Sequence, residues 1–429
     1  MSTHDAETNG NGARGRGGFK PHHIAIAIGI GMAVFTAASG VIPLITDWHN
    51  DNEHHRVVFG GIPAPLKLAF YTVIPVLLAW GAFRFADRMK NWERGRPAPT
   101  RTTTSKNVKR RFGDFRAGVY MRTLLRDPAA GLMHSLIYFG FLVLLAVTAT
   151  LEIDHQLPEA LKFLHGRTYQ GYAFVGDLAG LAFVGGLLWA FARRYVQRPY
   201  RIRIKTKGEH GLVLGVLLLI GLTGFSTEMF RIAAARAAGE SVEFERWSFI
   251  GYPLSTLVDG WSVTTLQTVH QWNWIVHVVA FCAFLVILPV TMLRHMFTSP
   301  LNMYLKDKTR PKGAMKPMPN LAETELESFG ASVVEDFTWK QLLDLDACTM
   351  CGRCTSVCPA HATGKPLDPR EIVLKTGEVM AATGNPVVSP PLQTAAGITV
   401  SANSLFERIT SEELWACTTC RACDEICPV

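Results

Sequence analysis

The sequence predicts a mainly α-helical protein in which a six-helix transmembrane bundle is followed by a smaller soluble helical domain. Two observations support this fold class. Of the 429 residues, 48% are apolar, and they are concentrated in long uninterrupted blocks, as is typical of membrane proteins. Eight of the nine cysteines fall between Cys348 and Cys427, after the last apolar block. The chain therefore divides into a membrane half and a cysteine-rich tail.

The apolar blocks form six candidate spans of about 20 residues or slightly more. At a rise of about 1.5 Å per residue, a helix of that length crosses the roughly 30 Å hydrocarbon core of a bilayer. A cleaved signal peptide is the alternative for the first span, but an even number of helices keeps the basic loops on one side. The spans cover residues 22–46, 65–85, 131–151, 172–192, 210–230 and 273–293.

Every second connecting segment is basic, which sets the predicted orientation. Basic loops remain in the cytoplasm, so both termini and the cysteine-rich tail are expected there, in a multi-pass protein of the cell membrane. The net charge of +8 thus reflects topology, and no basic, aromatic-rich stretch indicates a nucleic-acid partner. The basic segments are 14–20, 84–126, 193–207 and 294–316, and the acidic or polar ones are 47–52 and 152–158.

Histidines in the spans are candidate axial ligands for haem. His277 and His295 are 18 positions apart, which on one helix is five turns, so both would project from one face about 27 Å apart. The third span carries His134 at its cytoplasmic end and His155 at its opposite end. The third and sixth spans are antiparallel. His134 is therefore expected at the same depth in the membrane as His295, and His155 at the same depth as His277. This is the layout of two b-type haems, one near each membrane face.

Structural roles are the alternative for these histidines. A histidine at a helix end, as at His134, His155, His210 and His295, often only caps carbonyls or contacts lipid headgroups. His270 could replace His155 or His277, since it begins the sixth helix two turns earlier. Five further histidines are expected at the surface: His22, His23, His49, His54 and His55.

Three charged residues in the membrane half are candidates for proton exchange with a quinone. Asp177 interrupts the fourth span, and Glu228 precedes Arg231 at the outer end of the fifth. A carboxylate within a membrane is expensive to bury and therefore indicates a functional site. For Glu228, the alternative is an interfacial ion pair with Arg231.

The tail contains two cysteine runs with identical spacing. Each is C-x2-C-x2-C-x3-C-P, the ferredoxin-type pattern in which three cysteines bind one [4Fe-4S] cluster and the fourth binds its neighbour. A helix is expected between the runs, at 368–382. The predicted ligands of the first cluster are Cys348, Cys351, Cys354 and Cys427, and those of the second are Cys417, Cys420, Cys423 and Cys358.

Other interpretations of the cysteines fit this spacing less well. Zinc knuckles use paired C-x2-C steps without the third cysteine and the x3-C-P step, and disulfides are disfavoured in a reducing cytoplasm. Cys282 lies alone in the sixth span and is interpreted as a small buried apolar residue. No G-x-G-x-x-G follows a strand and no P-loop occurs, so no flavin or nucleotide site is predicted.

These features divide the chain into four predicted regions. Residues 1–20 form a disordered cytoplasmic N-terminus, 21–298 a transmembrane cytochrome b domain, 299–335 a linker, and 336–429 a ferredoxin-like domain with two [4Fe-4S] clusters. A folded domain rarely ends on the Pro-Val that closes its cluster loop. The last domain is therefore expected to be truncated at Val429.

A membrane domain with His134, His277 and His295, joined to both cysteine runs, resembles the heterodisulfide-reductase-like iron-sulfur and cytochrome b membrane oxidoreductases. In that family, a part similar to the nitrate reductase gamma subunit is fused to a part similar to the catalytic heterodisulfide reductase subunit. The resemblance implies haem ligands at these three histidines, whereas His155 lies farther along its helix than the pattern expects. Members of the family usually continue into cysteine-rich CCG segments, whereas this chain stops at Val429.

The resemblance is strongest to the actinobacterial type, which transfers electrons from electron-transfer flavoprotein to menaquinone. It implies a quinone-linked oxidoreductase of the respiratory chain that uses two [4Fe-4S] clusters and one or two haems b. One alternative is a quinol-linked reductase of a heterodisulfide or sulfur carrier. The other is a non-catalytic membrane ferredoxin without haem, in which the histidines are structural.

Overall fold

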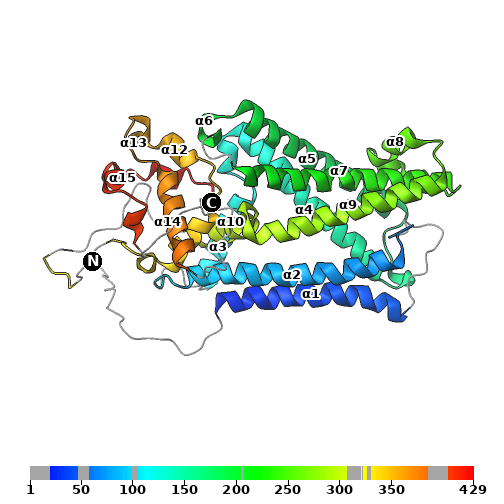
Figure 1. The fold of residues 1–429 in the computed structure, drawn as a ribbon, viewed down its shortest axis with the longest axis horizontal. Coiled ribbons are helices and arrows are strands. Elements are labelled where there is room, and N and C mark those ends of the chain that lie inside the picture. The colour runs from blue at the N-terminus through cyan, green and yellow to red at the C-terminus, as the bar shows by residue number, and fades with distance from the viewer. Residues whose placement is uncertain are drawn as a thin grey trace.

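The computed structural model describes residues 20–46, 58–98, 105–203, 207–306, 320, 322–325, 330–384 and 404–429. What the sequence predicts for residues outside these ranges is not tested by the structure. The described part of the chain is helical, and its only β pairing is an isolated bridge between Arg96 and Thr338. Figure 1 shows long helices lying side by side, with the short helices of the tail gathered at one end of them.

Six of the described helices are long and apolar enough to cross a membrane, which confirms the expected number of spans. Most extend beyond the apolar runs, because helical hydrogen bonding continues into polar residues at the ends. The spanning helices are α1 Pro21–Thr46, α2 Ala64–Trp92, α4 Pro128–Gln156, α5 Gly166–Phe191, α7 Gly208–Ala237 and α9 Val263–Val290.

Shorter helices connect the spans and build the tail. Helix α14 matches the helix expected at 368–382, and Asp368 caps its first turn by accepting from the Arg370 amide. The connecting helices are α3 Ser105–Val119, η2 Leu124–Arg126, η3 Glu159–Leu161, the π-helical η4 Ala192–Gln197, α6 Tyr200–Arg203, η5 Glu243–Trp247, α8 Gly251–Ser255, η6 Thr256–Val258, η7 Met292–Arg294 and α10 His295–Leu305. The tail contains η8 Val334–Asp336, α11 Trp339–Ala347, α12 Arg353–Val357, α13 Pro359–Ala362, α14 Pro369–Thr383, η9 Leu405–Glu407, α15 Ser411–Trp415 and α16 Ala422–Glu425.

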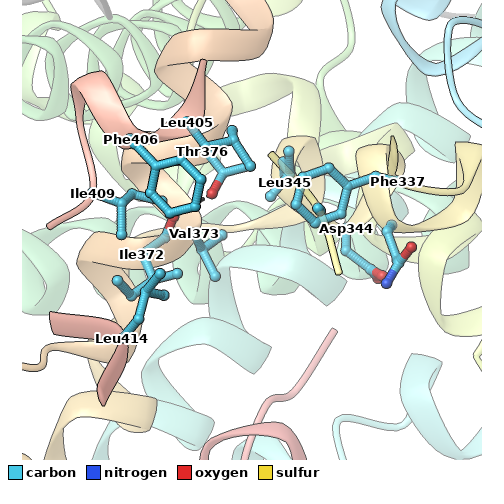
Figure 2. A pocket seen from close by; sticks show the side chains of 12 residues that line it. Phe337, Asp344, Leu345, Ile372, Val373, Thr376, Leu405, Phe406, Ile409 and Leu414 are labelled. Atoms are coloured by element: carbon cyan, nitrogen blue, oxygen red, sulfur yellow. Dashed lines mark hydrogen bonds between the residues drawn. The ribbon is translucent and has the colours of Figure 1, made fainter. Parts of the chain in front are cut away.

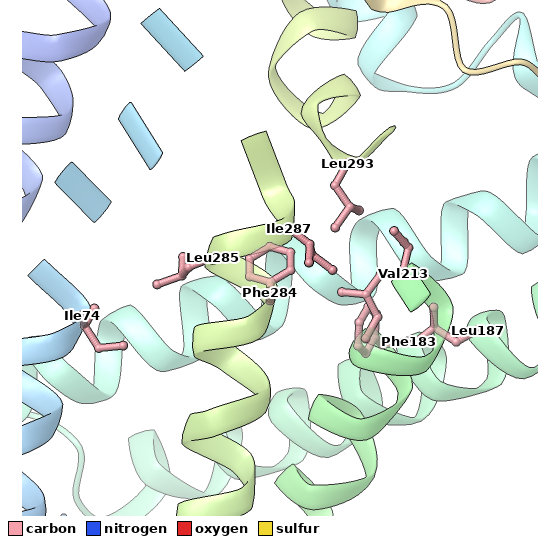
Figure 3. Packing of buried hydrophobic residues seen from close by; sticks show 9 residues of the cluster. Ile74, Phe183, Leu187, Val213, Phe284, Leu285, Ile287 and Leu293 are labelled. Atoms are coloured by element: carbon pink, nitrogen blue, oxygen red, sulfur yellow. The ribbon is translucent and has the colours of Figure 1, made fainter. Parts of the chain in front are cut away.

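The bundle is held by a core of interlocking apolar side chains. Helix α9 packs against α2 and α7, and α5 packs against α4 and α7. Figure 3 shows Phe284 and Ile287 of α9 near the middle of this core, with Phe183 of α5 on one side. Glycines allow α4 and α5 to approach closely, because a Cβ at Gly140 would lie 2.9 Å from the Phe183 nitrogen. Small residues at such contacts are typical of membrane helices.

The sequence suggested that the sixth span continues as one helix to His295, and the structure shows that it does not. Helix α9 ends at Val290, and Thr291 adopts an extended conformation with φ −110° and ψ −175°. Pro289 lies within the last turn of α9, just before this break. The buried Glu209 carboxylate then accepts from the Met292 amide. His277 and His295 therefore belong to different helices.

The ends of the spans that carry basic segments meet the cysteine-rich tail. Arg353 of the tail donates to the Leu124 carbonyl, which precedes α4. Arg370 donates to the Arg201 carbonyl in the basic segment after α5, at 2.7 Å. The described parts of the basic segments thus lie on the same side of the bundle as the tail.

One expected surface histidine is not at the surface. The His22 side chain is only 12% exposed, and its Nδ1 lies 2.8 Å from Glu93 Oε1. The expectation was wrong because α1 and α2 are packed along their length, which brings the first turn of α1 to the end of α2. His23 is exposed as expected. The other three lie outside the described residues: His49, His54 and His55.

A buried carboxylate fixes the tail to the bundle. Asp346, on α11, is 2% exposed, and it accepts from Arg88 Nε at 2.8 Å and from Trp92 Nε1 at 2.6 Å. Arg294 Nε lies 3.8 Å from the same carboxylate. Because α2 and the α9–α10 junction both supply partners, this one side chain holds three parts of the chain together.

Replacement of Asp346 by Asn should destabilise this junction by about 3–5 kcal/mol, because Arg88 and Arg294 would remain buried without a counter-charge. Thermal unfolding of the detergent-purified protein would measure the loss. Asp87→Asn is the control, since Asp87 pairs with the more exposed Lys90, and exposed pairs contribute little. Equal midpoints for the two variants would contradict the assigned role.

Candidate cofactor sites

The two cysteine runs have the same local backbone. Met350 and Thr419, which precede the second cysteine of each run, have φ values of 55° and 56°. The residues after those cysteines are also left-handed, with φ 71° at Gly352 and 57° at Arg421. Left-handed residues turn the chain sharply, which wraps each run around a centre. The equal spacing in sequence is therefore matched by equal backbone geometry.

The predicted ligands of the first cluster lie near one another. Burial raises the pKa of the Cys348 thiol to about 12, and the charges of Cys351, Cys354 and Cys427 contribute to the rise. Helices α12 and α16, one from each run, are in contact. Cys427 of the second run is thus placed beside the first three cysteines, as the assignment requires.

The predicted ligands of the second cluster are less closely grouped by the described contacts. The charge of Cys417 acts on Cys423, and Cys358 belongs to an apolar cluster against which Ala416 packs. Cys417 and Cys420 are exposed, whereas Cys358 is buried. Among the described residues, no three His, Cys, Asp or Glu side chains have the geometry of a single-metal site. The assignment of ligands to two clusters stays a prediction.

The donor chemistry fits iron–sulfur clusters. Each run presents thiols from a tightly turned loop, and thiolate is the ligand that such clusters require. Positive charge adjoins one predicted ligand of the first cluster, because Lys306 Nζ lies 3.3 Å from the Cys427 carbonyl oxygen. Positive charge favours the thiolate form of cysteine. Cys282 lies apart from both loops, on α9, and packs against the bundle core.

His134 and His295 come together although they belong to different segments. Their ring centres are 6.4 Å apart and their planes are tilted by 59°. His134 is on α4, and its buried Nδ1 has no hydrogen-bond partner. His295 is the first residue of α10, and its Nδ1 lies 2.6 Å from the Met292 carbonyl oxygen. This hydrogen bond holds the proton on Nδ1 and leaves Nε2 available as a ligand.

His134 and His295 are spaced so that they would be able to hold one haem iron between them. Metal–imidazole bonds are about 2 Å long, so two rings on opposite sides of one iron have centres roughly 6 Å apart. Burial lowers the pKa of His295, which favours the neutral ring that binds iron. His134 and His295 therefore lie side by side, as expected for this one pair, although the helix between His277 and His295 is broken.

The second histidine pair is less complete. His277 Nδ1 lies 2.9 Å from the Thr223 hydroxyl, an arrangement that again leaves Nε2 available. His155 contacts the Phe59 ring, with ring centres 5.7 Å apart, and Phe59 also contacts Trp274, one turn from His277. No described ring contact joins His155 directly to His277. His270, the alternative ligand, is buried, and so is the helix-end residue His210.

The three quinone candidates converge at the end of the bundle opposite the tail. Asp177 accepts from the amides of Ile250 and Gly251, at 2.6 and 3.2 Å, and so fixes the start of α8. The Glu228 carboxylate packs so closely against Gly251 that a Cβ added there would force the Glu228 side chain to shift. Arg231 Nη2 lies 3.9 Å from Glu228. Figure 1 shows α8 at the far end of the long helices from the tail.

Two further members of this group were missed in the sequence. Glu245 is 1% exposed, pairs with Arg231, and accepts from the Tyr169 hydroxyl at 2.8 Å. Both lie outside the apolar runs, so neither interrupts a span. The only feature of the sequence that could have indicated this group was the Glu245 carboxylate itself, which follows the span that carries Glu228 and Arg231. The group of Asp177, Glu228, Arg231, Glu245 and Tyr169 is called the distal charge cluster below.

An apolar cavity within the tail is separate from these sites. It has a volume of about 390 Å³ and lies between α11, α14 and η9. Figure 2 shows Ile372 and Val373 of α14 beside Leu405, Phe406 and Ile409. None of the predicted ligands lines it. The cavity offers apolar contact and one carboxylate, Asp344, and not a metal site.

Comparisons with known proteins agree with both halves of the chain. Residues 124–311 match the nitrate reductase gamma subunit family, and residues 344–429 match the 4Fe-4S dicluster domain. The chain is therefore a multi-pass membrane iron–sulfur protein in which a nitrate reductase gamma-like domain is joined to a dicluster domain. No solved structure matches it.

Curated relatives place the chain more closely, among homologues of membrane iron–sulfur oxidoreductases. It is 30% identical to an "EtfAB:quinone oxidoreductase" of Syntrophomonas wolfei subsp. wolfei over 87% of this chain and 54% of that protein. It is 29% identical to the "Probable iron-sulfur-binding oxidoreductase FadF" of Bacillus subtilis over 72% of this chain and 46% of that protein. A "Probable membrane-anchored ferredoxin" of Chromohalobacter salexigens is 41% identical over 23% of this chain and 16% of its own length. The chain thus spans about half the length of the first two relatives.

The assignment predicts that the fourth cysteine of each run binds the cluster held by the other run, and this can be tested by substitution. Cys427→Ser should remove the same cluster as Cys351→Ser, and about four of about eight irons, whereas Cys420→Ser should remove the other cluster. Iron analysis and low-temperature EPR spectra of the purified variants would show which signal is lost. Cys282→Ser is the control and should retain all iron. A Cys427→Ser spectrum that matches Cys420→Ser would contradict the assignment.

Proposed function

We propose that the protein transfers electrons from a soluble carrier of the electron-transfer flavoprotein class, through two [4Fe-4S] clusters and haem b, to menaquinone in the bilayer. The observation that carries the proposal is the His134–His295 pair, which lies at the end of the bundle against which the first cysteine loop packs. When bound, the clusters and haem would supply one-electron steps. The protein would supply their positions and electrostatic surroundings.

Each half of the chain has a defined part in this proposal. The eight cysteines would hold the clusters, and His134 with His295 would hold the haem nearer the tail. His277 is the candidate ligand for a second haem, with His155 or His270 as its partner. The tail lies on the side of the basic segments, which supports its placement in the cytoplasm.

The distal charge cluster would manage the protons of quinone reduction. It has three carboxylates and one guanidinium, so full ionisation would leave an excess of negative charge in buried surroundings. Such an excess is costly, and a proton on one carboxylate would relieve it. Glu228 is assigned the donor role, because its side chain lies against Gly251, whose amide Asp177 accepts from, and 3.9 Å from Arg231 Nη2.

The choice of electron donor rests on the relatives. The name of the Syntrophomonas protein joins an electron-transfer flavoprotein to a quinone, and this chain aligns with about half of it. Cys417 and Cys420 are exposed, and Trp415 beside them is 89% exposed. This face of the tail is open to a partner or to a further domain.

A reduced-minus-oxidised optical spectrum of the purified protein tests the proposal directly. We expect b-type haem absorption together with about eight non-haem irons per chain. Iron without any haem signal would contradict the proposal and favour a membrane ferredoxin with structural histidines.

The haem ligands can be tested by substitution. His134→Ala and His295→Ala should each remove the same haem, because both ligands would belong to one iron. The ratio of haem to protein and the position of the remaining absorption band would be compared. His23→Ala is the control, since His23 is exposed. Loss of different haems in the two variants would contradict the pairing.

The distal charge cluster predicts a separate kinetic effect. Glu228→Gln should slow quinone reduction by about 10² or more, as expected for loss of a general acid, while cluster and haem spectra stay unchanged. Steady-state reduction of a soluble menaquinone analogue would measure this. Glu240→Gln is the control, because Glu240 is exposed at the same end of α7. An unchanged rate in Glu228→Gln would remove this residue from the proton path.

A further inference from the structure

Arg353 lies between the cysteine loop and the membrane bundle. It stands between the second and third cysteines of the first run, yet it is only 4% exposed. Its Nη1 donates to the Thr123 carbonyl at 3.0 Å, and its Nη2 donates to the Leu124 carbonyl at 2.7 Å. These carbonyls immediately precede α4, the helix that carries His134. The fork of the guanidinium therefore fixes the first cysteine loop to the start of the haem-ligand helix.

The charge of Arg353 reaches both candidate cofactor sites. Cys351 and Cys427 are close enough to act on the guanidinium, and the guanidinium acts on His134. Burial lowers the pKa of Arg353, and Cys351 and Asp127 oppose that shift. An arginine remains protonated throughout the range in which proteins function. A permanent positive charge thus stands beside both sites.

The second cysteine run provides a contrast within the same protein. Its intervening arginine is Arg421, one position earlier in the motif, which pairs with Asp424 of its own loop. Its described hydrogen bond stays within the tail, and the Asp424 partner is half exposed. An arginine between the cysteines is therefore not enough to dock a loop on the bundle.

We propose that Arg353 is a positioning residue that docks the first cluster against the haem held by His134 and raises the reduction potential of both. Reduction adds an electron to each group, and a nearby buried positive charge stabilises the added negative charge. Burial of a cluster acts in the opposite direction, because it disfavours the more highly charged reduced form. The inference rests on the cofactors of the proposed function.

Redox titrations of the purified full chain test this role, with EPR for the clusters and optical absorption for the haem. In Arg353→Gln, we expect the midpoint potentials of one cluster and of the His134 haem to shift to more negative values. Arg353→Lys keeps the positive charge, so both potentials should stay close to their wild-type values. Arg421→Gln is the matched control and should leave both potentials at their wild-type values.

A second substitution, which removes a negative charge, tests the inference even if the Arg353→Gln variant loses its cluster. Asp127 carries negative charge near Arg353, and its side chain caps α4 by accepting from the Ala130 amide. Asn is an equally good capping residue, so Asp127→Asn removes charge with the cap retained. The same two potentials should shift to more positive values.

Four results would overturn the inference, and three of them concern the arginine variants. These three are unchanged potentials in Arg353→Gln with full iron content, equal shifts in the Gln and Lys variants, or a shift in Arg421→Gln as large as in Arg353→Gln. A shift of the wrong sign in Asp127→Asn would also overturn it. If wild-type protein showed clusters but no haem, the proposed function would fail first, and only the part of this inference that concerns the cluster could stand.

Discussion

The rigid attachment of the tail to the bundle is the constraint on which the arrangement of both sites depends. Asp346 provides it, because its carboxylate is shared by Arg88, Trp92 and Arg294 in a region with almost no access to water. Asp346 stands two residues before Cys348, and Arg294 stands one residue before His295. A single buried contact thus connects the first cysteine to the haem-ligand candidate. A solvent-exposed ion pair could not hold this separation as firmly.

The break in the sixth span has a positive role in this arrangement. An unbroken helix would have fixed the direction of His295 by that of His277, at one hundred degrees per residue. The extended Thr291 removes that dependence, and Glu209 satisfies the Met292 amide that the break exposes. His295 then starts a new helix, with its Nδ1 against the Met292 carbonyl. The interruption permits the ring to face His134.

Much of the fold could be predicted, since span length, basic loops and cysteine spacing are local properties. The six spans, the helix after Asp368 and the two equal loops all follow from such patterns. Contacts between distant segments could not be predicted, because they depend on which helices pack together. Glu245 looked like a loop carboxylate until Arg231 and Tyr169 enclosed it, and His22 looked exposed until Glu93 came beside it. Arg353 likewise had no signal beyond its place in the cysteine motif.

The backbone of the cysteine loops has a consequence for how the two halves of the tail could have diverged. Gly352 and Arg421 occupy equivalent left-handed positions, but a Cβ at Gly352 would lie 2.7 Å from the Arg201 carbonyl oxygen. The first loop therefore requires glycine there, whereas the second places Arg421 at this position and pairs it with Asp424 of the same loop. The two loops repeat one pattern, but they are not interchangeable parts. The first is shaped by its contact with the bundle, whereas the second keeps two of its cysteines, Cys417 and Cys420, exposed.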